Sequence, residues 1–164
     1  RIIPKKTVSK ASLGTLWSER CQSSHRNDGI IFTLNAASVG TGTSNAILKW
    51  KPAHSIDIRV EYTNGRWVML ANCNRSAGLV PLKKTKHGAV FVLQSTRLLE
   101  AIKIRQPCII ECVISLDGDR VLLTPERERT DKSSPNAIHT IEATVYNALE
   151  NISSDDLICL VNGR

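Results

Sequence analysis

Apolar and polar residues alternate most regularly in the middle of the chain. The apolar positions of this stretch are Ile56, Ile58, Val60 and Tyr62. A period of two is typical of a strand with one buried face. Asn64-Gly65 follows, a dipeptide favoured in two-residue type I′ turns. A hairpin closed there brings both apolar faces together, and it predicts the pairs Thr63–Arg66, Tyr62–Trp67, Val60–Met69 and Ile58–Ala71.

The pattern predicts further elements downstream. After a basic, Gly-containing loop at 76–88, the expected strands are "AVFVLQ", "CIIECVISL" and "RVLLTPERER", and "STRLLEAIKI" is an expected helix with Ser95 as its N-cap. Three strands, a helix and two strands are the element order of an OB-fold, a small Greek-key barrel. The alternative is another small barrel or a meander with the same elements.

A helix is expected near the C-terminus, with Ser134 as N-cap and Pro135 at its first position. One stripe of apolar residues predicts that it packs on the body and runs to about Asn151; the stripe is Ile138, Ile141, Val145, Leu149 and Ile152. The following "SSDDLICLVNGR" is expected to add a short strand.

The N-terminal part is less regular, with a helix expected around Ser12 to Cys21. "DGIIFTL" and "NAILKWK" are predicted to form an antiparallel hairpin. In such a strand Lys49 and Lys51 share one face, a spacing that suits two ammonium groups on successive oxygens of a phosphate chain. An edge strand that carries lysines against aggregation is the alternative.

Composition adds a basic surface and a reducing compartment to this picture. The 164 residues carry a net charge of +7 spread along the chain, which suits polyphosphate or nucleic acid but also ordinary solvated lysines. Five cysteines include no C-x-x-C pair, which argues against structural zinc, and Cys108 and Cys112 are expected in the core. No stretch is apolar enough for a membrane span or a signal peptide.

Several charged residues stand where they need a partner. Asp28 precedes an apolar strand, where its carboxylate could hold a divalent cation or simply form a turn. Asp57 lies between two isoleucines and needs solvent or a cation. Arg127 and Arg129 share a strand face and can fork onto phosphate oxygens, whereas a charged turn is the simpler reading of this stretch. The four histidines have no metal-site spacing, and no catalytic triad is readable.

Taken in order, "DGIIFT", "LKWKP" with "SIDI", and "IIEC…PERERTDKSSPN" resemble motifs IV, V and VI of the covalent nucleotidyltransferases. The superfamily also contains polynucleotide ligases, but the second and third stretches look more like the mRNA capping enzymes, or GTP:RNA guanylyltransferases. The three motifs span residues 28–136. The style of the sequence suggests a large DNA virus as its source.

The resemblance implies a division of roles. Lys49 and Lys51 would contact the nucleotide phosphates, with Lys51 nearest the α-phosphate, and Asp28 would lie near Mg²⁺ or Mn²⁺. Arg129, Asp131 and Lys132 would come down onto the β- and γ-phosphates. Arg127 is also expected to bind the nucleotide, and Asp57 is expected to have a supporting role. GTP and RNA with a 5′-diphosphate end are the implied substrates.

One departure from the family limits this reading, because no K-x-D-G nucleophile motif occurs in the sequence. An α+β, mostly β chain is therefore expected: residues 1–52 as the last strands of a nucleotidyltransferase domain, and 53–164 as an OB-fold barrel with a C-terminal helix. The N-terminal half of that domain would be a partner, and triphosphatase or methyltransferase domains could flank it. The expected location is intracellular: a viral factory, virion or host cytoplasm for a viral protein, and the nucleus for a cellular one.

Two other functions stay open from the residues alone. A basic OB module that binds RNA or a protein partner without catalysis would explain the missing nucleophile. A fragment of a polynucleotide ligase would share the superfamily motifs but use ATP.

Overall fold

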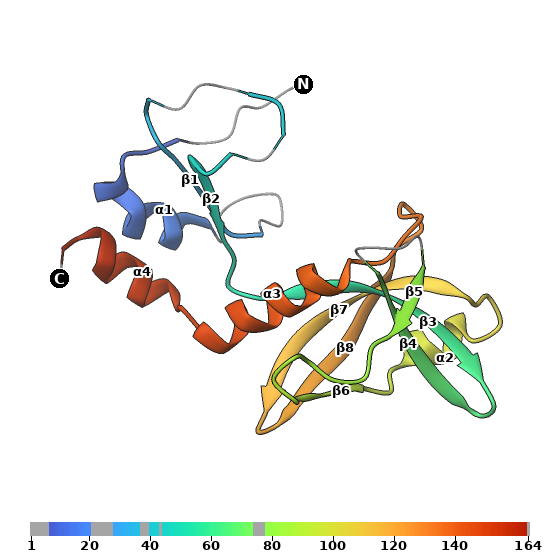
Figure 1. Ribbon diagram of the computed structural model, residues 1–164. Helices are drawn as coiled ribbons and strands as arrows, with labels where there is room; N and C mark the ends of the chain where they lie inside the picture. Colours follow the sequence, from blue (N-terminus) through green and yellow to red (C-terminus); the bar gives the residue numbers. More distant parts are fainter. Residues whose placement is uncertain (1–6, 21–27, 37–39, 43, 74–77, 164) are drawn as a thin grey trace. The chain divides into compact units, whose positions relative to one another are not determined.

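The computed structural model describes residues 7–20, 28–36, 40–42, 44–73 and 78–163 (Figure 1). The chain divides into two compact units, the first of Arg1–Pro52 with Ile152–Arg164 and the second of Ala53–Asn151. The last thirteen residues thus group with the first unit, whereas the sequence analysis grouped them with the OB-fold domain. Among the residues described, no helix is long and apolar enough to cross a membrane.

The first unit contains a two-stranded sheet and two short helices. The short 3₁₀ turn η1 (Lys10–Ser12) leads into α1 (Leu13–Glu19), and β1 (Ile30–Thr33) pairs antiparallel with β2 (Ile47–Trp50). The predicted helix and hairpin are confirmed, although Cys21 lies outside the described residues. The Trp17 and Trp50 rings meet edge to face at 5.0 Å, and the Trp50 indole donates a hydrogen bond to the Ile152 carbonyl.

The strand predicted after residue 151 is wrong, because this segment forms helix α4 (Ser154–Val161). Ser153 and Asp156 make a complete capping box: the Ser153 hydroxyl accepts from the Asp156 N–H, and the Asp156 carboxylate accepts from the Ser153 N–H. Asp155 and Asp156 also place negative charge in the first turn, where the helix dipole favours it. These start signals outweigh the strand-like apolar run that follows them.

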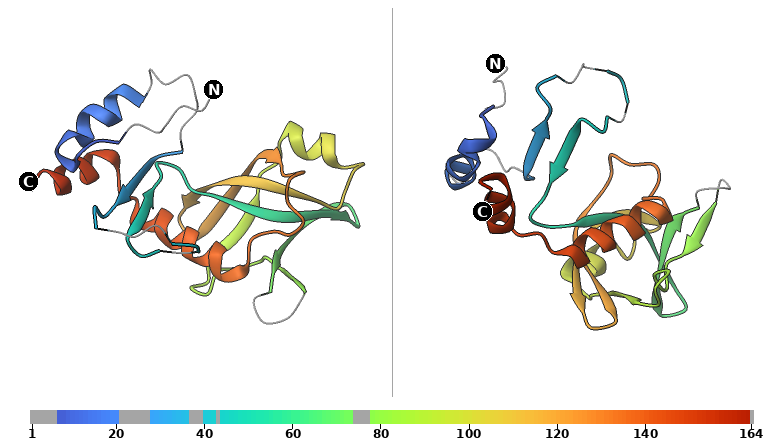
Figure 2. Two further views of the ribbon diagram at one scale, coloured as in Figure 1. Left: turned by 90° about the horizontal axis from the view of Figure 1, so that it is seen from above. Right: turned by 60° about the vertical axis from the view of Figure 1, so that its left-hand side comes forward.

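The second unit is built on one mixed, six-stranded sheet of order β5-β4-β3-β7-β8-β6 (Figure 2). Its strands are β3 (Ser55–Thr63), β4 (Arg66–Asn72), β5 (Leu79–Pro81), β6 (Val90–Leu93), β7 (Cys108–Asp117) and β8 (Arg120–Glu128). All neighbours pair antiparallel except β6 and β8, which are parallel. The α+β, mostly β class is therefore as expected.

The β3–β4 hairpin confirms the predicted turn and its register. Asn64 and Gly65 both have positive φ, of 53° and 77°, as a type I′ turn requires. The pairs Thr63–Arg66, Tyr62–Trp67 and Val60–Met69 form as predicted. The fourth predicted pair does not appear in the ladder, which ends at Arg59–Leu70, and Ile58 pairs with Ile110 of β7.

A closed barrel is not observed in the part of the chain that the structure describes. Strands β5 and β6 are the two edges of the sheet, and a single bridge between Lys84 and Val90 joins the segments beside them. The chain turns back at Thr85 to Gly88, where the Gly88 N–H donates to the Thr85 carbonyl at 3.0 Å. Strand β5 was not predicted, because it lies in the polar loop and contains a proline.

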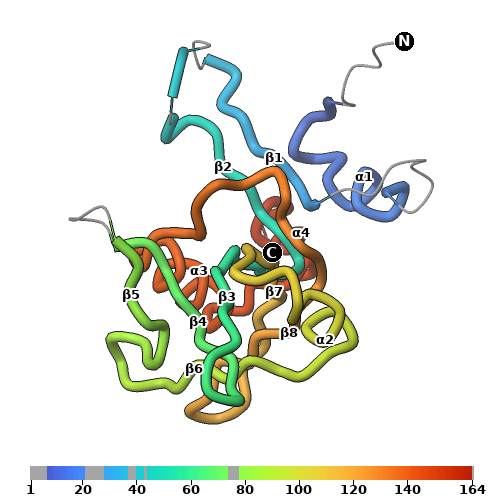
Figure 3. The backbone as a smooth tube through the Cα atoms, turned by 90° about the vertical axis from the view of Figure 1, so that its right-hand side faces the viewer, coloured from blue at the N-terminus to red at the C-terminus, as the bar shows by residue number. Residues whose placement is uncertain are grey.

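Two helices flank this sheet, α2 (Arg97–Ile102) and α3 (Ile138–Glu150), and they lie at opposite ends of the second unit (Figure 3). The N-cap of α2 is Thr96 and not Ser95. Helix α3 begins three residues later than predicted, since Asn136 and Ala137 bond to β3 and β4 instead of entering the helix. It ends as predicted, with Asn151 in the left-handed conformation at φ 46°.

One hydrophobic core unites the sheet and both helices of the second unit. It takes Ile56, Ile58 and Val60 from β3, Leu99 and Ile102 from α2, and Ile141 and Val145 from α3, all at most 4% exposed. Cys108 and Cys112 lie in it as expected. Burial raises the pKa of Cys112 to about 12, so this thiol stays protonated and is no nucleophile near neutral pH.

Candidate functional site

Five charged side chains of the second unit gather around Asp57 on β3. We call the six residues together the Asp57 cluster: Asp57, Glu111, Arg127, Arg129, Asp131 and Lys132. The Asp57 side chain is 8% exposed, and its two oxygens bind different cations. Oδ1 accepts from Arg129 Nη1 at 2.9 Å, and Oδ2 accepts from Lys132 Nζ. Asp57, which was expected to need solvent or a cation, thus binds two cations from a segment more than seventy residues away along the chain.

Carboxylates surround the Arg129 guanidinium. Its Nε and Nη2 donate to the two oxygens of Asp131 at 2.9 and 2.8 Å, and its Nη1 also lies 3.6 Å from Glu111 Oε2. The hydrogen bonds to Asp131 raise the pKa of Arg129, and in return they lower the pKa of the Asp131 carboxyl. Asp131 therefore fixes the plane of a permanently charged guanidinium, in the fork geometry that also suits phosphate oxygens.

Glu111 on β7 connects Arg129 with Arg127. Its Oε1 accepts from Ser55 Oγ at 2.7 Å and its Oε2 from Arg127 Nε at 2.7 Å. Burial raises the pKa of Glu111, but the hydrogen bonds from Ser55 and Arg127 outweigh this effect and lower it overall. The shared partner confirms that Arg127 and Arg129 lie on one face of the chain.

A β-bulge places these arginines. Glu111 pairs with Arg127, whereas the next residue, Cys112, pairs with Pro125, so β8 carries one extra residue, Glu126, at this point. A bulge bends its strand and re-aims the side chains beyond it. Pro125 lacks an N–H and fits this irregular position in the ladder.

Asn136 anchors the cluster from the other side. Its Oδ1 accepts from the Asp57 N–H and its own N–H donates to the Asp57 carbonyl, both at 2.8 Å. Its carbonyl accepts from the Asn72 N–H at 3.0 Å. The segment that carries Arg129 and Lys132 is therefore tied back to the strand that carries Asp57.

Glu111 and Asn136 were not predicted as site residues. Glu111 carried a readable signal, since a charged residue inside the apolar run "CIIECVISL" needs a partner in the same way as Asp57. Asn136 carried no signal of its own, because its role depends on which strand it meets.

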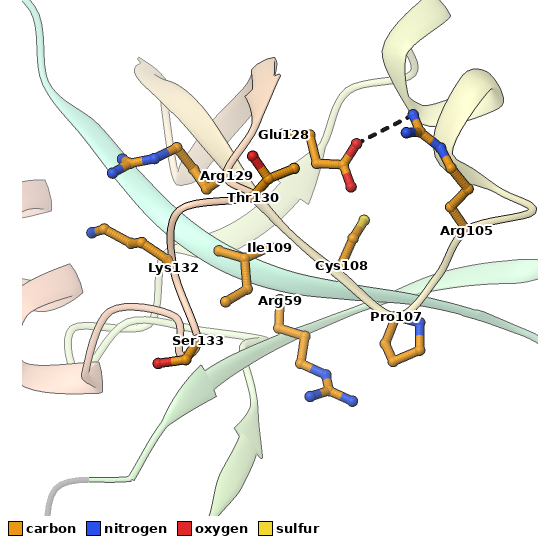
Figure 4. Close-up of a pocket in the computed structure, with 10 residues that line it drawn as sticks. All are labelled: Arg59, Arg105, Pro107, Cys108, Ile109, Glu128, Arg129, Thr130, Lys132 and Ser133. Carbon is orange, nitrogen blue, oxygen red and sulfur yellow. Dashed lines mark ion pairs between the residues drawn. The ribbon is translucent and has the colours of Figure 1, made fainter.

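A pocket lies beside the cluster, lined by Arg59, Arg105, Cys108, Glu128, Thr130 and their neighbours (Figure 4). Arg129 and Lys132 extend from its rim in the same direction, as the figure shows. At the opposite rim Arg105 pairs with Glu128 at 3.2 Å. Among the residues described, no three His, Cys, Asp or Glu side chains come together as a metal site would need.

In the first unit, Lys49 and Lys51 both approach Asp28, and we call these three residues the Asp28 cluster. The Asp28 Oδ2 lies 3.2 Å from Lys49 Nζ and 3.8 Å from Lys51 Nζ. The side chains of Asp28, Lys49 and Lys51 are 63%, 44% and 39% exposed. Gly29 allows the backbone beside Asp28 to approach the backbone of Trp50 closely, because a Cβ there would lie 2.0 Å from the Trp50 carbonyl oxygen.

The structure thus groups the sequence-predicted site residues into two clusters, one in each unit. Asp28 lies with Lys49 and Lys51, and Asp57 lies with the residues from Arg127 to Lys132.

No protein-family model matches the chain. A search of curated proteins finds the mRNA-capping enzyme of Caenorhabditis elegans, 28% identical over 151 residues, an alignment that covers 84% of this chain. The chain spans about a fifth of the worm protein, 22% of its length. This distant similarity supports a relationship to the mRNA-capping enzymes, which are transferases.

Proposed function

We propose that the chain is part of a GTP:RNA guanylyltransferase, which transfers GMP to the 5′-diphosphate end of RNA during cap formation. One observation carries the proposal: Arg129 and Lys132 both bind the Asp57 carboxylate, so that the stretches resembling motifs V and VI form one assembly. The similarity to the worm capping enzyme supports it independently.

In this proposal the Asp57 cluster binds the β- and γ-phosphates of GTP. Arg127, Arg129 and Lys132 supply the positive charge, Asp131 orients Arg129, and Asp57 supports Arg129 and Lys132. Three cations face three carboxylates here, so an incoming polyphosphate has to compete with the carboxylates. Cations placed where charge grows on a leaving pyrophosphate would lower the barrier to its departure.

The Asp28 cluster binds the α-phosphate region in the same proposal. Lys51 and Lys49 serve as point charges beside the oxygens of the α-phosphate, and Asp28 offers one carboxylate to Mg²⁺ or Mn²⁺. A single carboxylate fits such an ion, because Mg²⁺ is commonly held by one or two carboxylates, water and substrate phosphates. When bound, the ion would neutralise phosphate charge.

The transfer takes two steps in the proposed enzyme. A lysine Nζ forms a bond to the α-phosphorus of GTP as the bond to the β-phosphate breaks and pyrophosphate leaves. GMP then passes to a terminal phosphate oxygen of the RNA, and the lysine is released. The K-x-D-G motif that would carry this lysine does not occur in the 164 residues, so the proposal assigns it to a partner half of the domain.

The first unit supports the need for such a partner. Its two-stranded sheet has apolar side chains exposed on both faces, with Ile31 at 46%, Ile47 at 48% and Leu48 at 63%. Isolated two-stranded sheets are only marginally stable, and side chains of this kind are normally covered by further strands or helices. We assign the first unit to the end of a nucleotidyltransferase domain because its two strands carry the stretches that resemble the family motifs, "DGIIFT" and "LKWKP".

The second unit is proposed to be an OB-fold domain. Its strand order β4-β3-β7-β8-β6, the parallel β6–β8 pair and helix α2 before β7 agree with OB topology if β5 and β6 are taken as one interrupted strand. The bridge between Lys84 and Val90 lies at the interruption.

Covalent labelling tests the proposed function. The longer protein that carries this chain with a K-x-D-G lysine is incubated with Mg²⁺ and either α-labelled GTP or α-labelled ATP, and the 164-residue chain is treated in parallel. We expect label from GTP on the longer protein and none on the shorter chain. Label from ATP would instead identify a ligase, and label on the shorter chain would show that the nucleophile had been misplaced.

A further inference from the structure

A second group of cations lies in the segment between β5 and β6 of the second unit. Lys83, Lys84 and Lys86 lie with His87 in the segment between β5 and β6, and all four are exposed. Across the described ranges, these three lysines form no ion pair, whereas Arg59, Arg105, Arg127, Arg129 and Lys132 each do. Their charge is therefore free to meet an external anion.

The backbone of this segment, residues 82–89, is well anchored. Thr85 is 8% exposed, its N–H donates to the Ala89 carbonyl at 2.8 Å, and its Oγ1 accepts from the Ala89 N–H. The Lys86 N–H donates to Glu142 on α3 at 2.9 Å. Leu82 is 2% exposed and holds the start of the segment in the core. The lysines are thus presented from an ordered turn, which limits the entropy lost on binding.

Arg120 extends the same surface across the sheet. Lys84 pairs with Val90, and Val90 pairs in turn with Arg120 at the start of β8. Arg120 is exposed, and it forms no ion pair in the portion that the structure describes. Asp119 lies beside it, so the surface is not purely basic. The segment lies at the side of the second unit away from α2 (Figure 3).

We propose that Lys83, Lys84, Lys86 and Arg120 bind the phosphate backbone of single-stranded RNA. The inference rests on the proposed function, in which RNA is the acceptor, and it adds the surface that holds the RNA. Separate lysines act as point charges and match a flexible row of phosphates. Such contacts carry no base specificity.

An acidic peptide fits this surface less well. Protein interfaces depend on buried aromatic or aliphatic anchors in addition to charge. None of the large hydrophobic side chains found exposed falls within residues 82–89. The surface therefore offers positive charge without an apolar anchor. This suits contacts to backbone phosphates, which are electrostatic.

RNA binding by the 164-residue chain tests the inference. The probe is a fluorescently labelled, single-stranded 20-nucleotide RNA of mixed sequence, and anisotropy gives Kd between 50 and 200 mM salt. The variant is K84A/K86A, and its charge-matched control is R66A/R97A. Arg66 and Arg97 are also exposed, and they are the first residues of β4 and of α2.

We expect K84A/K86A to weaken binding about tenfold at low salt and to reduce the slope of log K against log salt by about 1.4, since each single-strand phosphate contact contributes about 0.7. The control should change Kd less than threefold, with both variants unfolding at the temperature of the parent chain. Equal losses in variant and control would overturn the inference. Displacement of the RNA by a polyglutamate peptide at equal charge concentration would also overturn it.

GTP is absent from this measurement, so its outcome does not depend on formation of a GMP adduct. A chain that binds RNA through the 82–89 segment while the longer protein fails to label would refute the proposed transferase and keep the RNA surface.

Discussion

The two ion clusters differ in how firmly the protein holds them. In the Asp28 cluster one exposed carboxylate meets two exposed lysines at 3.2 and 3.8 Å. In the Asp57 cluster a carboxylate that is 8% exposed meets an arginine that is 15% exposed at 2.9 Å, and Asn136 fixes the backbone behind it. The first pairing is loose and screened by water, whereas the second is part of the fold.

This difference has a physical consequence for both stability and binding. Exposed ion pairs contribute about 0–1 kcal/mol, so a ligand can replace Asp28 as the partner of Lys49 and Lys51 at little cost. Removing one member of a buried pair leaves an uncompensated charge and costs several kcal/mol. Asp57 should therefore act mainly by fixing where Arg129 and Lys132 lie.

The largest effect is expected from Asp57→Ala. The change leaves Arg129 and Lys132 without the carboxylate between them, and we expect it to lower the free energy of unfolding of the second unit by about 3–5 kcal/mol. Urea unfolding followed by circular dichroism measures the loss. Glu150→Ala, which removes an exposed carboxylate at the end of α3, serves as control. A loss no larger than that of the control would contradict a structural role for Asp57.

Asn136→Ala should have the next largest effect. It leaves the N–H of Asp57 without its acceptor inside the fold, which costs about 1–3 kcal/mol. The matched control is Asn147→Ala on the exposed face of α3. If both variants unfold at the same urea concentration, the hydrogen bonds of Asn136 do not hold the segment in place.

Acid should weaken the second unit through its carboxylates. The pKa of Asp131 and that of Glu111 are both lowered in the folded chain. A carboxyl group with a lowered pKa stabilises the fold above its unfolded value, about 4, and this contribution is lost as the pH falls through the folded pKa. We expect the urea concentration at the midpoint of unfolding to stay constant from pH 7 to about 5 and to fall below about pH 4. The fall should be shallower in Glu111→Gln. An equally steep decline in that variant would exclude Glu111 as a contributor.

The smallest effect on stability is expected from Asp28→Ala. Because Asp28 is 63% exposed, its removal should change the free energy of unfolding by at most about 1 kcal/mol. Thermal unfolding followed by the fluorescence of Trp17 and Trp50 in the first unit would measure it. A loss as large as that of Asp57→Ala would show that the two clusters do not differ as described.

Local patterns predicted the elements that depend on local chemistry. The Asn64-Gly65 turn and its register followed from the alternation of apolar residues, and the need of Asp57 for a cation followed from its place between two isoleucines. Helix α4 was not predicted although Ser153 and Asp156 form a capping box, because the apolar run that follows them is also typical of a strand.

Long-range contacts decided the remainder, and the sequence contains no direct sign of them. Pro135 looked like the first residue of a helix, yet Asn136 bonds to Asp57 and delays α3 to Ile138. The sequence indicates that Glu111 needs a partner, but which partners it finds depends on β7 lying beside β3 and β8. A residue whose role depends on a partner far along the chain cannot be identified from its neighbours.

The most direct test is GMP adduct formation by Arg129→Ala and Lys51→Ala in the proposed longer protein that would carry the nucleophile. We expect Lys51→Ala to unfold like the parent, and Arg129→Ala to be less stable because Asp57 loses a partner but still folded by circular dichroism at the assay temperature. We expect both variants to form adduct from α-labelled GTP at a sharply reduced rate. A variant that labels like the parent would contradict the assignment of its side chain to the nucleotide phosphates.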